Sequence, residues 1–235
     1  MSDAALRRAA QKTASTWQGD WPPPVPGNST QTGWGGMVYQ ATSAPVTSVT
    51  ATFTVPTLSG NAGAVASCWV GIGNVFQTGI YLSYNTGSAG NNDPYPAWTW
   101  FIQGNGASQF WESAVYPIAA GNSLTLTLAL AGTYWVATQA NHTQGWSYAN
   151  STPVQAVGIA TSTWGYPFNT AAIIIEKEGS ANLPDYGSLT FTNIATVPAI
   201  VAADIGYITT VNSSTDQTPG TYSNGSFTMN WAAYA

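Results

Sequence analysis

Glu176 is the residue of this chain that most clearly could do acid or base chemistry. It ends the run TAAIIIE (170–176), whose β-branched residues predict a buried strand. Alternation along that strand places Ala172, Ile174, Glu176 and Glu178 on one face. A carboxylate beside isoleucine has to be hydrogen-bonded, paired, or kept for the proton that it exchanges. From the residues alone, both a structural role and a catalytic role of Glu176 are possible interpretations.

The other reactive side chains favour structural roles. His142 is the only histidine and lies in the loop-like ANHTQG, within an Asn-X-Thr sequon, so we expect it on the surface. Cys68 is the only cysteine, and its apolar neighbourhood predicts a small core residue. The sequence has no G-x-S-x-G motif, no phosphate-binding glycine loop and no metal-ligand spacing. We therefore expect no cofactor and no metal, and carboxylate chemistry remains.

Composition describes a globular chain with very little charge. Only 6% of its 235 residues are charged, against about a quarter in ordinary domains. Because few groups titrate, we expect the fold to persist at about pH 3 and the protein to work in acid. The net charge of -5 argues against a nucleic-acid partner. No apolar run reaches the roughly 18 residues that a membrane span requires.

Short alternating runs, bounded by Gly, Pro, Asn and Ser, fill the chain from Trp34 onward. No helix interrupts them, which is typical of antiparallel sheets. The sequence predicts an all-β, antiparallel two-sheet β-sandwich over residues 31–235. The expected strands are 33–41, 46–56, 65–73, 75–85, 95–103, 110–118, 123–130, 134–140, 170–178, 188–194, 203–210 and 226–234.

Residues 1–30 differ in kind from the rest of the chain. Arg7, Arg8 and Lys12 are three of the four basic residues, and a Pro-rich linker follows them. This stretch lacks the apolar core of a signal peptide. We expect a short helical or disordered extension, and an inhibitory pro-segment that pairs with an acidic site is the alternative.

Six segments, taken together and in order, resemble the glutamic peptidases, also called eqolisins. These are acid-acting endopeptidases with a concanavalin A-like β-sandwich. The matching segments are WGGMV (34–38), TATFTVP (50–56), ASCWVGIG (66–73), FQTGIYL (76–82), AAIIIEKE (171–178) and LPDYGSLTFTN (183–193). They are similar to the family's W-S/A-G-A-V, E/A-F-T-V-P, A-S-A-W-V-G-I-D, L-Q-T-G-V-D-F, A-E-W-I-V-E-D and L-A-D-F-G-T-V-T-F-T-N.

The resemblance implies a catalytic pair, Gln77 and Glu176. Side chains directly opposite on neighbouring antiparallel strands lie about 5 Å apart at Cβ, so an amide and a carboxylate could hold one water. Ionised Glu176, with an ordinary pKa of about 4.3, would take a proton from that water while Gln77 donates to the oxyanion. The resemblance also implies that Trp34, Trp69 and Trp98 line a cleft for polypeptide substrates. It implies a secreted protein, which we expect to be a monomer.

The chain departs from the family at three acidic positions. Gly73, Tyr81 and Trp100 stand where the family carries carboxylates, and Glu112 is a candidate replacement acid. Asp185, in LPDYG, is expected to bond local backbone in a turn instead of acting as a catalyst.

Two other functions fit the same residues. A glycoside hydrolase needs two carboxyl groups, and Glu176 and Glu178 would lie roughly 6.5 to 7 Å apart along one strand. A carbohydrate-binding module without catalysis would use the aromatic residues and leave Glu176 idle. An amide facing the acid is a requirement of the peptidase alone, so Gln77 separates these alternatives.

Overall fold

The computed structural model describes residues 28–60, 62–73, 76–84, 95–101, 108–110, 115–153, 168–178, 182–211 and 215–233. Within these ranges the protein forms strands and one short 3₁₀ turn, η2 (Ala202–Asp204), and no α-helix. The expected all-β class is therefore confirmed. Most of the expected extension, residues 1–27, lies outside the described part.

The strands are β1 (Ser29–Gln31), β2 (Trp34–Gln40), β3 (Ser48–Thr54), β4 (Ala64–Ile72), β5 (Phe76–Tyr84), β6 (Ala97–Phe101), β7 (Ser108–Phe110), β8 (Ser123–Ala131), β9 (Tyr134–Asn141), β10 (Trp146–Pro153), β11 (Thr170–Lys177), β12 (Ser188–Val197), β13 (Ile205–Val211), β14 (Thr215–Pro219) and β15 (Phe227–Ala233).

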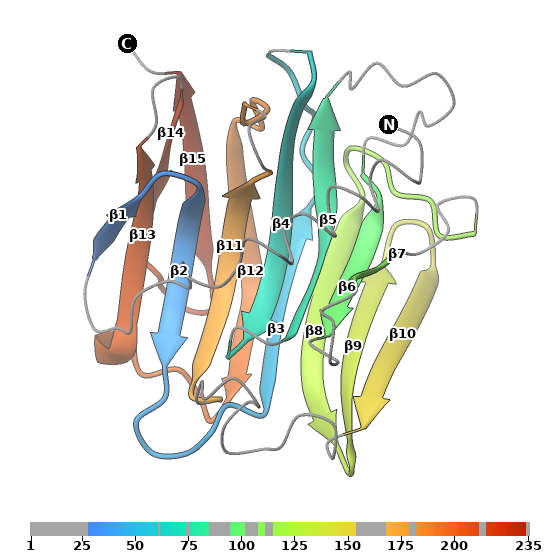
Figure 1. The fold of residues 1–235 in the computed structure, drawn as a ribbon, viewed down its shortest axis with the longest axis vertical. Helices are drawn as coiled ribbons and strands as arrows, with labels where there is room; N and C mark the ends of the chain where they lie inside the picture. Colours follow the sequence, from blue (N-terminus) through green and yellow to red (C-terminus); the bar gives the residue numbers. More distant parts are fainter. Residues whose placement is uncertain are drawn as a thin grey trace.

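The strands form one hydrogen-bonded sheet that folds over into two layers (Figure 1). Its order is β10-β9-β8-β3-β12-β15-β14-β13-β2-β11-β4-β5-β6-β7. The front layer contains β2, β11, β4, β5 and β6, and the back layer contains β12, β3, β8, β9 and β10. These pairs are antiparallel, while the short β1 pairs with β13 in parallel. The expected antiparallel sandwich is confirmed, with its two layers joined through β13, β14 and β15.

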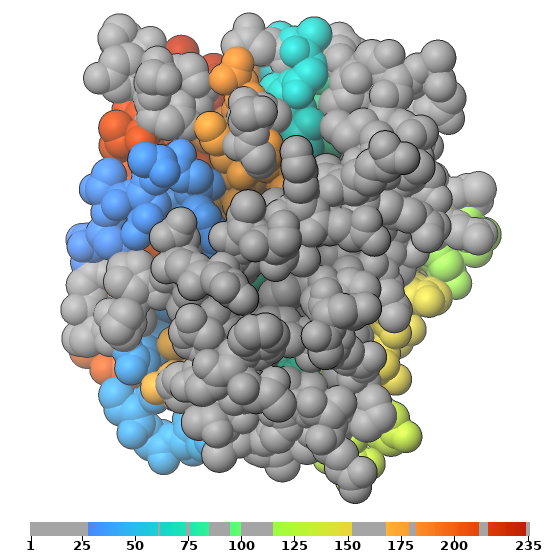
Figure 2. All heavy atoms as spheres, in the orientation of Figure 1, coloured from blue at the N-terminus to red at the C-terminus, as the bar shows by residue number. Residues whose placement is uncertain are grey.

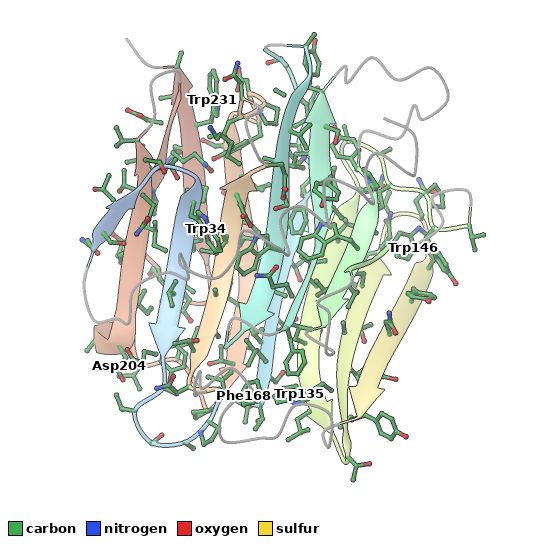
Figure 3. All side chains as sticks on the ribbon, viewed as in Figure 1. Trp34, Trp135, Trp146, Phe168, Asp204 and Trp231 are labelled. Carbon is green, nitrogen blue, oxygen red and sulfur yellow. The ribbon has the colours of Figure 1, made fainter. Side chains whose placement is uncertain are left out.

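The main hydrophobic core lies between the two layers. The main strands of both layers contribute alternate residues to it, as the period of two requires. The largest buried side chains of the core include Tyr39, Phe76, Phe168, Phe53 and Trp135. Trp135 and Phe168 lie near the lower end of the sandwich in Figure 3, and their ring centroids are 5.6 Å apart.

A second, smaller apolar cluster covers the other face of the front layer. Because its residues alternate with those of the main core, the central strands of this layer are buried on both faces. This confirms the expectation of a buried strand before Glu176. The cluster consists of Val38, Val65, Trp69, Tyr81, Trp98, Ala172, Ile174 and Ile208, with the half-buried Trp34 packed against it.

The predicted elements differ from the structure in two ways. The expected strand 110–118 is wrong over residues 115–118, which form a turn and irregular backbone before Ile118 enters the core. Four strands were not predicted, namely β1, β10, β14 and β7, which shares only Phe110 with the expected strand 110–118. They lie at the ends or at the bend of the sheet and are rich in polar residues, so they show no alternation of apolar side chains. Within the described ranges, no helix has the length and apolarity to span a membrane.

Candidate active site

Strand β11 carries Glu176 into the second apolar cluster. On either side of it, the backbone partners of Glu176 are Trp34 of β2 and Ser67 of β4. The Glu176 side chain is only 7% exposed. Its Oε2 accepts a hydrogen bond of 3.1 Å from the indole Nε1 of Trp69. The sequence predicted a carboxylate among isoleucines that needs a partner, and the structure supplies an indole N–H.

Glu178 lies two residues further along the chain, directly after β11, and changes the acidity of the site. Burial raises the pKa of Glu176 well above its ordinary value, the charge of Glu178 raises it further, and the Trp69 N–H lowers it. Burial also raises the pKa of Glu178, to about 7, against the opposing effect of the Ser67 hydroxyl. Both carboxyl groups therefore hold protons at acid pH. The sequence-based mechanism used the unperturbed glutamate pKa of about 4.3, whereas burial and Glu178 raise the pKa of Glu176 in the fold.

Gln77 is the second residue of β5 and is only 3% exposed. Its backbone partners are Gly71 of β4 and Trp100 of β6. Among the described residues, the Gln77 amide Nε2 has no hydrogen-bond partner. A buried amide donor without a partner is costly, so native proteins seldom keep one without a reason. The hydrogen-bonding capacity of this N–H is left unused by the described residues.

Gln77 and Glu176 lie on the same face of the front layer, but they do not oppose each other. Strand β4 lies between β5 and β11, so the expectation that the pair faces across neighbouring strands is wrong. Residues that pair across neighbouring strands form a row that crosses the sheet. Gly71 is the β4 residue in the row of Gln77, whereas Ser67 is the β4 residue in the row of Glu176. The two side chains are thus related by a diagonal of two strands and four residues. Trp69 occupies the middle of that diagonal.

Two glycines make room for the indole of Trp69. A Cβ on Gly71 would lie 2.7 Å from the ring atom Cζ3 of Trp69. Gly79 is the β5 residue directly opposite Trp69, and a side chain there would collide with the Trp69 Cβ at 2.7 Å. The ring therefore extends from the Glu176 carboxyl, at its Nε1, to the row that holds Gln77. It forms the floor between the two candidate catalytic side chains.

The three expected cleft tryptophans all belong to this face. Trp69 is fully buried, and Trp98 is 5% exposed. Trp34 is half-buried and meets Trp69 edge to face, with ring centroids 5.6 Å apart. Figure 3 places Trp34 over the middle of the front layer. In Figure 2, blue atoms of β2, orange atoms around the end of β11 and cyan atoms of β4 lie side by side in the upper half of this face. A role of these rings in binding peptide stays a prediction.

Replacing Trp69 with phenylalanine tests the bond to Glu176. This change keeps an aromatic ring and removes the N–H that lowers the Glu176 pKa, so the pKa should rise further. At a fixed pH below neutrality, we expect peptidase activity to fall about tenfold or more, as is usual for a lost bond to a charged group. The measurement is the pH dependence of kcat. Trp135→Phe is the matched control, since the Trp135 Nε1 has no partner among the described residues and lies in the main core, so its loss should leave the pH profile unchanged.

Among the three positions where the family carries a carboxylate and this chain does not, that of Tyr81 lies nearest to Glu176. It lies in the row of Ser67 and Glu176, and it is 6% exposed. Burial raises its pKa well above the ordinary value, and the charges of Glu178 and Glu176 add to this. A neutral phenol therefore stands where a third carboxyl would have added repulsion. Gly73 lies directly after β4, while Glu112 and the Trp100 side chain fall outside the described part.

The expectations for Asp185, His142 and Cys68 are confirmed. Asp185 accepts a 2.9 Å hydrogen bond from the Gly187 backbone N–H, as expected for a turn residue. His142 is exposed in a turn, with its Nε2 2.8 Å from the Thr125 hydroxyl. Cys68 is fully buried, and burial raises the pKa of its thiol. Within the described ranges, no group of three or more His, Cys, Asp or Glu residues is arranged to hold a metal ion.

Comparison with known families identifies the family of this chain. Residues 32–231 match the model of the peptidase A4 family. The chain belongs to this family. Membership makes it one of the glutamic peptidases, a group of peptide hydrolases, and confirms the resemblance seen in the sequence motifs. No curated protein matches this A4 family member.

Solved structures share the fold of this peptidase A4 family member. Scytalido-glutamic peptidase with a transition-state analogue inhibitor is 20% identical, with a TM-score of 0.63, over 86% of this chain and 99% of that chain. SCP-B, a member of the eqolisin family bound to a tripeptide, is 20% identical, with a TM-score of 0.60 and the same coverage. At this level of identity, the likeness establishes the β-sandwich fold.

Proposed function

We propose that this protein is an endopeptidase of acid solutions in which Gln77 and Glu176 form the catalytic pair. The observation that carries the proposal is the shared face of the front layer, where an unpartnered buried amide and a buried carboxyl lie on either side of Trp69. Family membership supports a peptide as the substrate, and the solved relatives are described with peptide-based inhibitors or a tripeptide. We also propose that the protein acts outside the cell, as the resemblance implies.

In this mechanism, the peptide binds at this face of the front layer and its carbonyl group sits between the two side chains. Ionised Glu176 takes a proton from a water molecule as the water oxygen attacks the carbonyl carbon. The Gln77 Nε2–H donates to the oxygen on which negative charge develops, and this explains a donor held without a partner. Glu176 then returns the proton to the leaving nitrogen as the C–N bond breaks.

The raised pKa of Glu176 sets the pH range that we expect. Its ionised form becomes more abundant as pH rises toward the raised pKa, so kcat should increase from pH 3 toward pH 6 instead of peaking at the most acid end. The measurement is the initial rate of peptide hydrolysis across this range. A rate that is highest at pH 3 and falls steadily above it would contradict ionised Glu176 as the base.

Digestion of denatured haemoglobin or casein, with hydrolysis of β-glucans run in parallel, tests the reaction class. We expect cleavage of the proteins and none of the glucans. The opposite result would favour the glycoside hydrolase, in which Glu176 and Glu178 are the acids. Binding of glucans without cleavage of either substrate would favour the carbohydrate-binding module.

A further inference from the structure

Gln139 is a buried glutamine of the back layer whose amide reaches across the main core to the front layer. It lies on β9 and is fully buried. Its Nε2 donates to the Thr78 hydroxyl at 3.0 Å and to the Gly79 carbonyl at 2.8 Å. The same nitrogen lies 3.2 Å from the Trp98 carbonyl. Among the described residues, its Oε1 has no partner, so this amide is held in place through its donors.

The partners of Gln139 are the residues that follow Gln77. Thr78 and Gly79 come directly after it on β5, and Trp98 faces Gly79 from β6. The Thr78 hydroxyl also donates to the Trp98 carbonyl at 3.2 Å and lies 3.2 Å from the Thr99 hydroxyl. One amide from the opposite layer thus fixes β5 and β6 together. It does so at the beginning of β5, where Gln77 is the second residue.

The strand geometry connects this network to the candidate site. Thr78 points into the main core, so Gln77 points to the opposite face of β5, where Trp69 and Glu176 lie. Because the Gln77 Nε2 has no partner among the described residues, its place depends on the backbone that carries it. Hydrogen bonds in a dry core are strong and directional, so the network holds that backbone in one register. An apolar side chain at 139 would leave the carbonyl of Gly79 without this donor.

We propose that Gln139 is a positioning residue, which holds the start of β5 so that the Gln77 amide is aimed at the reacting carbonyl. This assignment rests on the proposed function. It predicts that the loss of the Gln139 amide affects turnover more than substrate binding, because the oxyanion donor acts in the transition state. Small displacements of such a donor carry large costs in rate.

Gln139→Met tests the assignment, because methionine keeps the length of the side chain and removes its donors. We expect kcat to fall about tenfold to a hundredfold with KM changed less than about twofold, after correction for the folded fraction. Gln217→Met is the matched control. Gln217 is another fully buried glutamine, on β14, and it bonds Tyr186 and Thr210 instead of β5. This control should lose stability to a similar degree and keep its kcat.

A double-mutant cycle separates positioning from a general loss of structure. In a Gln77→Ala background, with its low residual rate, Gln139→Met should cause no further fall in kcat, since the side chain on which it acts is gone. An equal fall in both backgrounds, or an unchanged kcat in Gln139→Met, would overturn the assignment while the proposed function stands. Partial recovery of kcat in Gln139→Glu at pH 4, where a buried carboxyl is protonated and can donate, would support it. A wild-type protein that cleaves no peptide would overturn the proposed function, and the assignment with it.

Discussion

Replacing Glu176 with glutamine is expected to lower kcat for peptide hydrolysis by about 10²- to 10⁴-fold, the usual contribution of a general acid or base. Glutamine has the same shape and can still accept the Trp69 N–H, so the sandwich should keep its fold. Replacing Gln77 with alanine should lower kcat by about 10²- to 10³-fold, the usual cost of a lost oxyanion donor. Both values are measured as initial rates on a denatured protein substrate near pH 5.

Ser83→Ala provides a control for these variants. Ser83 lies on the same face of β5 as Gln77, is also buried, and its hydroxyl has no partner among the described residues. Its removal should leave kcat within about twofold, since it lies six residues from Gln77 along β5 and pairs with Val65, beyond the β4 residue that pairs with Glu176. Full activity of Gln77→Ala or Glu176→Gln, with the control equally active, would end the proposed mechanism.

The free energy of unfolding is expected to fall as pH rises from 4 to 8. The folded-state pKa values of Glu176 and Glu178 are raised above 4.5, so the folded protein binds more protons than the unfolded chain above that pH. Their contribution is therefore complete below about pH 4.5, and it is lost as pH rises through the folded-state values. For Glu178, with a pKa of about 7 and partial exposure, the loss by pH 8 is about 2 kcal/mol, or about 5 °C in Tm.

Circular dichroism melts of the wild type and of Glu178→Gln measure this effect. The variant removes one titrating group and the charge that raises the Glu176 pKa, so its Tm should change less between pH 4 and pH 8. The fold should persist at about pH 3, because the paucity of charged groups leaves little to titrate. A Tm that rises from pH 4 to pH 8, or equal slopes for the two proteins, would show that these carboxyls are not held protonated by the fold.

The local pattern of the sequence was sufficient to predict most strands and the burial of Glu176. Alternation is a property of neighbouring residues, so TAAIIIEKE indicated a buried strand with Glu176 and Glu178 on one face before any fold was known. The same argument fails for β10 and β14, because polar strands at an edge or a bend lack apolar alternation. Local patterns also do not indicate which strands pair with each other when they are far apart in the chain. The expectation that β5 and β11 are neighbours was wrong for this reason.

The amino-acid sequence by itself determined the all-β class, the peptidase A4 motifs and the choice of candidate catalytic residues. The tertiary structure decided how those residues are placed relative to one another. It placed β4 between Gln77 and Glu176, laid Trp69 across the gap, and set Glu178 close enough to raise the Glu176 pKa. It also brought Gln139 from the opposite layer to the back of β5. The physical reason is that side-chain direction follows from the backbone period of two, whereas strand order, register and burial depend on contacts between residues far apart in the chain.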